Sequence, residues 1–284
     1  MVEKFSITVP ELSGEEERFI YIYTPTDYEI NTHRHYPVLY MFDGQNLFFD
    51  EDASFGTSWK LSDYLDFMDT PIIVAALDCN SGPNGERMSE YSPFGDEDPD
   101  YGYLEGKGKI TMDFFVGEFK QYIDENYRTI KDRDHTFIGG SSMGGFMSLY
   151  AIMEYNDIFS KAAVLSPTLW FGHDELMHMI QNAEIDPYTV VYTDYGTFEF
   201  DEYQEAFNQY KELVLELMNK QVMLTSRLVP FGDHSEGSWH KQIPAFMDVL
   251  LYDMEEEYIS DDVYEHYEGD SYGESEFDDF EEGE

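Results

Sequence analysis

Hydrophobic and polar residues alternate near the start of the chain and then give way to continuous apolar runs. The alternation at 3–9 and 18–23 predicts two strands of an antiparallel hairpin at a sheet edge, joined by a polar turn near Ser13. The runs at 37–42 and 71–77 are apolar and aromatic throughout, which is typical of strands buried on both faces. The start of the chain therefore predicts an edge hairpin followed by central strands.

Over the rest of the chain, extended and helical patterns alternate. Further strands are expected at 135–138, 162–166, 189–193 and 221–229, and helices at 58–68, 111–126, 142–153, 173–182, 201–219 and 239–252. Strands that alternate with helices pair in parallel, because each helix crosses over the sheet between two strands. The pattern predicts an α/β fold with a mostly parallel central sheet and helices on both faces.

One long segment interrupts this alternation. Residues 78–109 are rich in Gly, Pro, Asn and Asp, which break helices and strands. Loops of this length inside a compact domain usually carry function or are partly disordered. We therefore expect a long functional or partly disordered loop here.

Charge separates the end of the chain from the rest. Residues 253–284 hold sixteen Asp and Glu residues and no Lys or Arg, so repulsion opposes a packed core. No linker interrupts residues 1–252. We expect one α/β domain over residues 1–252 and a disordered acidic tail over residues 253–284.

The formal charge of the whole chain is −44, and residues 1–252 still carry −28 without the tail. Nucleic acids and anionic membranes would be repelled by such a chain. The sequence therefore argues against both classes of partner, and we expect neither nucleic acid nor membrane to bind.

Composition narrows the class of protein further. Hydrophobic residues make up 42% of the chain and aromatic residues 17%, enough for a sizeable core. The single cysteine, Cys79, excludes an internal disulfide and provides no metal-ligand cluster. Residues 1–12 lack the apolar segment of a signal peptide, and no apolar run is long enough to span a bilayer. We expect a cytoplasmic protein with no metal site.

The strongest chemical signal is the segment HTFIGGSSMGG at 135–145. Gly140, Ser142 and Gly144 fit the pattern G-x-S-x-G between an apolar strand and an apolar helix. Such a turn strains the backbone at the serine and presents its hydroxyl above the sheet at a helix N-terminus. Centring the pattern on Ser141 fails, because residue 143 is methionine. Ser142 is therefore the candidate nucleophile, and the alternative is a serine that only caps the helix.

A serine hydroxyl needs a base to take its proton, and histidine titrates near neutral pH. Of the eight histidines, His234 alone lies in a loop between the last expected strand and the last expected helix. Functional loops of parallel sheets gather at the carboxyl ends of the strands. His234 is therefore the candidate base, and the alternative is a loop histidine that hydrogen-bonds only its neighbours.

The base in turn needs a carboxylate to hold its tautomer. In this fold class the acid lies between the serine and the histidine in the sequence. Asp194, Glu199 and Asp201 follow the strand expected at 189–193. Spacing alone does not choose among them, and in so acidic a chain each is also compatible with simple solvation.

Several segments together resemble the Fes-like esterases of the α/β-hydrolase superfamily, which include enterochelin esterase-like proteins, feruloyl and acetyl-xylan esterases, S-formylglutathione hydrolases and mycolyltransferases. The matching segments are PVLYMFDGQNLF at 37–48, RMSEYSP at 87–93, GGSSMGG at 139–145, LSPTLWF at 165–171, DYGTFE at 194–199 and GDHSEGSW at 232–239. They occur in family order and cover most of residues 1–252. The acidic tail has no counterpart in this pattern.

The resemblance implies the α/β-hydrolase fold and a catalytic triad. Ser142 matches the nucleophile, His234 the base and Glu199 the acid, although many relatives carry Asp at the acid position. The backbone N–H groups of Met143 and Gln45 match the oxyanion donors, which stabilise the charge on the reacting oxygen.

Other residues of these motifs have weaker assignments. Arg87 and Tyr91 could contact substrate or, together with Glu90, could pin the long loop by an ion pair. Trp170 and Trp239 could line the substrate pocket, with packing as the alternative. Glu236 could orient the loop of His234.

The combined interpretation is a serine hydrolase that cleaves small-molecule carboxylic esters through an acyl-enzyme on Ser142, with no cofactor. One alternative is an acyltransferase that uses the same triad. Another is a catalytically silent binding protein on a hydrolase fold, whose acidic tail recruits a basic partner.

Overall fold

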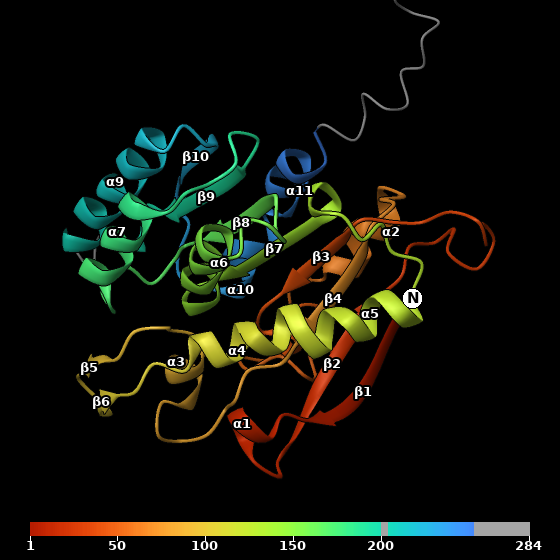
Figure 1. Ribbon diagram of the computed structural model, residues 1–284, viewed down its shortest axis with the longest axis horizontal. Helices are drawn as coiled ribbons and strands as arrows, with labels where there is room; N and C mark the ends of the chain where they lie inside the picture. The colour runs from red at the N-terminus through yellow and green to blue at the C-terminus, as the bar shows by residue number, and fades with distance from the viewer. Residues whose placement is uncertain (200–203, 253–284) are drawn as a thin grey trace, which may run out of the picture. The chain divides into compact units, whose positions relative to one another are not determined.

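The computed structural model describes residues 1–199 and 204–252, and Met1–Leu250 forms one compact unit (Figure 1). Within the described residues, eight strands form one sheet in the order β1-β2-β4-β3-β7-β8-β9-β10. The strands are β1 (Val2–Thr8), β2 (Glu17–Tyr23), β3 (Val38–Met41), β4 (Ile73–Leu77), β7 (Thr136–Ser141), β8 (Lys161–Leu165), β9 (Val190–Gly196) and β10 (Met223–Val229). The acidic tail and Asp201 lie outside the described residues.

The sheet is antiparallel at one end and parallel elsewhere. Strands β1 and β2 form the expected hairpin at the edge, and β2 pairs with β4 in antiparallel register. All pairs from β4 to β10 are parallel. Both the N-terminal antiparallel hairpin and the mostly parallel central sheet are thereby confirmed.

Helices cover both faces of the sheet (Figure 1). They are α1 (Pro10–Ser13), α2 (Leu61–Phe67), α3 (Glu86–Glu90), α4 (Gly108–Phe114), α5 (Lys120–Asn126), α6 (Met143–Glu154), α7 (His173–Asn182), α9 (Gln204–Asn219), α10 (Glu236–His240) and α11 (Ile243–Leu251). On one face, Tyr40 packs edge-on against Phe119, the last residue of a π-helical turn between α4 and α5. On the other face, Tyr192 packs against Phe246 of α11. The core therefore lies in two layers, one on each side of the sheet.

The expectation of one helix at 239–252 was wrong, because the chain forms α10 and α11 there. Pro244 stands in the first turn of α11. Proline lacks an N–H, and its ring would clash with the carbonyl of residue 240 in a continuous helix. The break lets the loop of His234 lead into its own short helix.

The segment at 78–109 is more ordered than its composition predicts. It contains α3 and a small hairpin formed by β5 (Asp96–Asp98) and β6 (Gly102–Leu104). Arg18 of β2 reaches Glu90 of α3 at 3.0 Å and Asp78 at 2.8 Å. Arg18 and Glu90 are both buried, so this ion pair fixes the segment to the sheet. The connection between β1 and β2 likewise contains the short helix α1 instead of a turn alone.

Residues 1–199 and 204–252 contain neither a membrane-spanning helix nor a metal-binding cluster. None of their helices has the length and apolarity that a bilayer crossing requires. They also contain no group of three or more His, Cys, Asp or Glu side chains arranged to hold a metal ion.

Candidate active site

The turn between β7 and α6 has the conformation of a nucleophile elbow. Ser142 has φ 58° and ψ −125°, a strained region for a residue with a side chain. A Cβ on Gly140 would lie 2.8 Å from the backbone of Gly144, and one on Gly144 would lie 3.0 Å from Phe42. The two glycines are therefore needed for the tight turn, and the turn presents the hydroxyl of Ser142 at the carboxyl end of β7.

The hydroxyl of Ser142 contacts a histidine and a threonine. Its Oγ lies 2.9 Å from Nε2 of His234, which is 92 residues away in the sequence. The second neighbour is Oγ1 of Thr168, at 3.2 Å. The loop between β10 and α10 thus brings an imidazole to the elbow, as a nucleophile requires.

The other nitrogen of His234 contacts a buried carboxylate. Nδ1 lies 2.7 Å from Oε2 of Glu199, in the turn after β9. An ionised carboxylate only accepts hydrogen bonds, so Nδ1 carries the proton and Nε2 of the neutral ring accepts from Ser142. This arrangement can take a proton from the hydroxyl and hold the resulting imidazolium.

Glu199 is itself held on its second oxygen. Oε1 accepts from the N–H of Gly196 and from the hydroxyl of Ser166, both at 2.8 Å. Its side chain is 4% exposed, whereas that of His234 is 45% exposed. Glu199 is therefore held inside the protein, while the ring of His234 is accessible from the cleft.

The competing carboxylate, Asp194, lies behind this group. Its oxygens accept from the hydroxyl of Tyr192 at 2.7 Å and from the N–H of Ser166 at 3.3 Å. Burial raises the pKa of Asp194 to about 6. Since Glu199 is the carboxylate that contacts His234, the geometry favours Glu199 over Asp194.

Trp239 lies outside the lining of the cleft, although its motif suggested a place in the substrate pocket. It is 5% exposed, does not line the cleft, and packs edge-on against His234 with ring centroids 5.0 Å apart. Its indole N–H donates to Ser166 at 3.0 Å. Trp239 therefore packs behind His234, and the assignment to the substrate pocket was wrong.

Sequence reasoning missed Ser166 as a member of the site. This residue follows β8 directly, with φ 39°, and lies between Asp194 and Glu199. Its place in LSPTLWF, after a strand of the parallel sheet, is the signal that could have identified it.

The expected oxyanion donors lie at the starts of two helical segments. Met143 is the first residue of α6, and Gln45 lies in the 3₁₀ turn Gly44–Asn46. The first N–H groups of a helix have no acceptor within the helix, so both are suited to an external oxygen. The side chain of Gln45 accepts from the N–H of Cys79 at 3.1 Å, which anchors this turn.

Arg87 and Tyr91 both form hydrogen bonds with Asp43, the residue before the 3₁₀ turn that contains Gln45. Asp43 has φ 55°, and its carboxylate accepts two hydrogen bonds of 2.7 Å from Arg87. Its N–H donates to the hydroxyl of Tyr91 at 3.1 Å. Tyr91 is 1% exposed and does not line the cleft, so its assignment as a substrate contact was wrong. Glu90 pairs with Arg18 and Arg87 with Asp43, in agreement with the pinning role.

A cleft of about 760 Å³ opens beside Ser142 and His234. Its lining consists of Arg87, Met88, Ser142, Met143, Thr168, Trp170, Tyr195, Phe198, Glu199, Glu205, Ala206, Gln209, Asp233 and His234. Arg87 and Trp170 therefore both line this cleft. Glu236 is buried at the start of α10, and burial raises its pKa.

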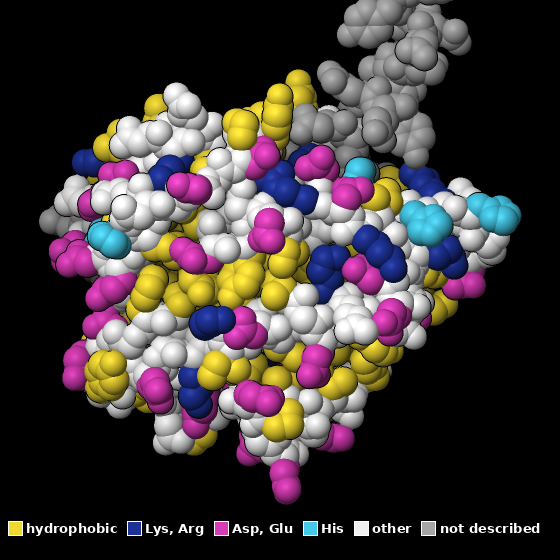
Figure 2. Space-filling model, in the orientation of Figure 1, with side chains coloured by type: hydrophobic (Ala, Val, Ile, Leu, Met, Phe, Trp, Pro, Cys, Tyr) yellow, Lys and Arg dark blue, Asp and Glu magenta, His cyan; other side chains and the backbone are white. Residues whose placement is uncertain are grey.

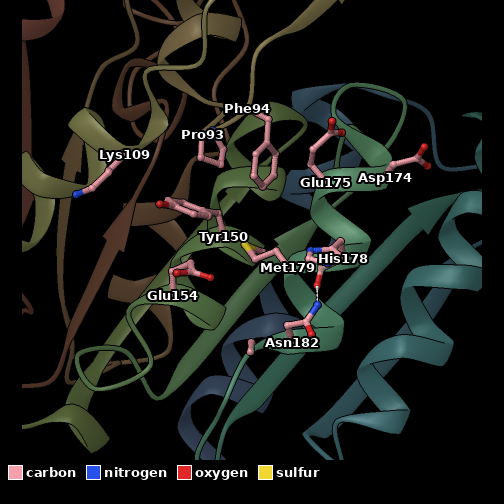
Figure 3. Close-up of a pocket in the computed structure, with 11 residues that line it drawn as sticks. Pro93, Phe94, Lys109, Tyr150, Glu154, Asp174, Glu175, His178, Met179 and Asn182 are labelled. Carbon is pink, nitrogen blue, oxygen red and sulfur yellow. Dashed lines mark hydrogen bonds between the residues drawn. The ribbon is translucent and has the colours of Figure 1, made fainter.

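A second cavity of about 700 Å³ lies between α6, α7 and the segment around Phe94 (Figure 3). Tyr150 and Glu154 of α6 face His178 and Met179 of α7 across it. Figure 2 shows hydrophobic side chains gathered near the middle of one face, among acidic ones. No serine, threonine or cysteine belongs to the lining of this cavity, so it lacks the serine–histidine pair of the cleft.

Comparisons with known proteins agree with this geometry. The family model described as "Putative esterase" matches residues 13–250. The uncharacterized protein YbbA of Bacillus subtilis (strain 168) is 22% identical over 155 residues. That alignment covers 53% of this chain and 56% of YbbA, so the match spans little more than half of that relative.

Two solved structures share the fold at low sequence identity. An IroE-like serine hydrolase from Shewanella oneidensis has a TM-score of 0.69 at 18% identity, covering 87% of this chain and 78% of that one. The siderophore hydrolase EstA of Aspergillus nidulans has a TM-score of 0.66 at 14% identity, covering 86% of this chain and 93% of that one. Together with the sheet and helices described above, these matches establish the α/β-hydrolase fold.

Proposed function

This chain belongs to the esterase family whose model matches residues 13–250, and we propose that it cleaves carboxylic esters through an acyl-enzyme formed on Ser142. The observation that carries this proposal is the chain of contacts from Ser142 Oγ to His234 Nε2 at 2.9 Å and from His234 Nδ1 to Glu199 at 2.7 Å. Family membership supports the class of reaction, and the contacts support the roles that we propose for the three residues.

Acylation begins when Ser142 Oγ attacks the ester carbonyl carbon and its proton passes to Nε2 of His234. The carbonyl oxygen becomes an oxyanion that accepts hydrogen bonds from the N–H groups of Met143 and Gln45. Each such donor lowers a barrier of this kind by about 3 kcal/mol. The intermediate then collapses, the C–O bond to the alcohol breaks, and His234 returns the proton to the departing oxygen.

Deacylation repeats these steps with water as the nucleophile. His234 takes a proton from the water, whose oxygen attacks the acyl carbon. The bond to Ser142 Oγ then breaks, and the proton returns to that oxygen. Throughout, Glu199 stabilises the imidazolium and keeps Nδ1 protonated. None of these steps requires a metal or an organic cofactor.

The substrates we propose are small-molecule esters in the cytoplasm. One solved neighbour is described as a siderophore hydrolase, which supports a small-molecule substrate. The cleft of about 760 Å³ is of a size that holds a small organic ligand.

The test is the hydrolysis of p-nitrophenyl acetate and butyrate by purified protein and three variants. We expect Ser142→Ala and His234→Ala each to lose at least about a thousandfold in kcat, because the two residues act as a unit. Ser141→Ala is the matched control: it removes a neighbouring hydroxyl and keeps most activity. Undiminished turnover by Ser142→Ala would overturn the proposal. Adding a competing alcohol separates a hydrolase from an acyltransferase, which would form the new ester.

A further inference from the structure

Two aromatic side chains of the cleft expose much of their surface beside the catalytic residues. Trp170 is 50% exposed and Phe198 is 49% exposed. Large apolar side chains that remain accessible inside a cleft provide a contact surface for a ligand. The face of an indole or phenyl ring also attracts a cation, because the ring carries negative charge density on its face.

The single arginine of the cleft is already matched by a carboxylate. Arg87 donates from Nε and Nη2 to the two oxygens of Asp43, both at 2.7 Å. Asp43 is 4% exposed, so its charge lies against the guanidinium and away from solvent. A substrate carboxylate at Arg87 would meet a neutral ion pair instead of a free cation.

The remaining charged side chains of the cleft are acidic. Glu205 and Asp233 belong to the lining, and neither forms an ion pair within residues 1–199 and 204–252. Glu199 is a third carboxylate of the lining, and its negative charge is not offset when His234 is neutral. The cleft therefore has a negative potential at the place where an ester binds.

We propose that this cleft selects esters that carry a positive charge, such as an alkylammonium group, on the part of the substrate next to the ester bond. The cation contacts the faces of Trp170 and Phe198 and lies near Glu205 and Asp233. Esters with a carboxylate at the same position are disfavoured. This inference rests on the proposed function, because the ester has to react at Ser142.

The test compares three butyrate esters of similar size. They are butyrylcholine, its neutral carbon isostere 3,3-dimethylbutyl butyrate, and the butyrate ester of 3-hydroxypropanoate. At low ionic strength we expect kcat/KM to fall in that order, with at least about a tenfold preference for the cation over its isostere. A ratio of one or less between butyrylcholine and the isostere would overturn this inference alone. Failure to cleave any of the three would overturn the proposed function and the inference with it.

Variants distinguish a local effect from the negative charge of the whole chain, formally −44. The quantity compared is kcat/KM for butyrylcholine divided by kcat/KM for its neutral isostere. We expect Glu205→Gln and Trp170→Leu each to lower this ratio at least about threefold. Glu154→Gln removes the same charge from the second cavity and is the matched control. The ratio stays unchanged in that variant. An equal fall in Glu154→Gln and Glu205→Gln would overturn recognition by the cleft.

Discussion

The indole N–H of Trp239 donates a hydrogen bond to the hydroxyl of Ser166, 3.0 Å away. Because an indole N–H only donates, Ser166 Oγ is the acceptor, and its own O–H is directed to Glu199 at 2.8 Å. Two residues outside the proposed triad thereby fix the oxygen of Glu199 that His234 does not contact. The orientation of the acid is set from behind the site.

We expect Trp239→Phe to lower kcat about tenfold with little change in KM. Phenylalanine keeps an aromatic ring beside His234 and removes only the donor to Ser166. Trp59→Phe is the matched control. The ring centroids of Trp59 and Trp239 are 6.1 Å apart, and Nε1 of Trp59 has no hydrogen-bond partner among the described residues. Steady-state kinetics of both variants on one ester measure the effect. Equal kcat values for the two variants would contradict an orienting role for Trp239.

Replacing the two buried carboxylates separately tests the choice of acid. We expect Glu199→Gln to lower kcat at least about a hundredfold, because an amide cannot stabilise the imidazolium and can impose the wrong tautomer. Asp194→Asn changes kcat less than about threefold, since Asp194 contacts Tyr192 and Ser166 instead of His234. Single-turnover rates of both variants check this. A larger loss in Asp194→Asn would identify Asp194 as the acid.

Asp194 also predicts a pH dependence of stability. Its pKa is raised to about 6 in the folded protein from an ordinary value of 3.8, by burial. Between these values the folded state binds more protons than the unfolded state, so this residue lowers the free energy of unfolding as pH rises from 4 to 6. The loss is complete above pH 6 and amounts to at most about 3 kcal/mol.

Urea unfolding of wild type and Asp194→Asn at several pH values measures this effect. Relative to wild type, the variant gains stability as pH rises from 4 to 7. A stability difference that stays constant across this range would contradict the raised pKa.

The ion pair of Arg87 and Asp43 supports the turn that carries Gln45. We expect Arg87→Lys to lower kcat about tenfold, because lysine is a point charge and cannot make both hydrogen bonds to Asp43. The same change at Arg34, which pairs with Asp27 at 3.1 Å, provides the control and leaves kcat unaltered. Kinetics on a neutral ester avoid any effect of substrate charge. Unchanged kcat in Arg87→Lys would show that the turn keeps its geometry without this pair.

Much of the fold follows from local patterns in the sequence. The part that does not follow from them depends on a contact between distant residues. The central strands are read from apolar runs, because both of their faces are buried. The order within 78–109 depends on Arg18 and Glu90, which are 72 residues apart, so local composition does not reveal it. The break at Pro244 could have been predicted, since proline excludes a continuous helix.

The candidate site also contains residues that local patterns indicate and residues that only the folded structure reveals. Local patterns indicate Ser142 and His234, and the structure brings their side chains within 2.9 Å. Spacing alone left the acid open, and only the family resemblance selected Glu199. Ser166 and Trp239 contact each other although they are 73 residues apart in the sequence, so local patterns do not reveal their hydrogen bond. The roles of all five residues remain predictions for experiment.

The central claim is that Ser142 is an activated nucleophile, and covalent labelling tests it most directly. Native protein is treated with a fluorophosphonate probe, and the modified peptide is identified by mass spectrometry. We predict one adduct, on Ser142, which forms much more slowly in His234→Ala and is absent in Ser142→Ala. No adduct on native protein, or an adduct on a different residue, would contradict the account.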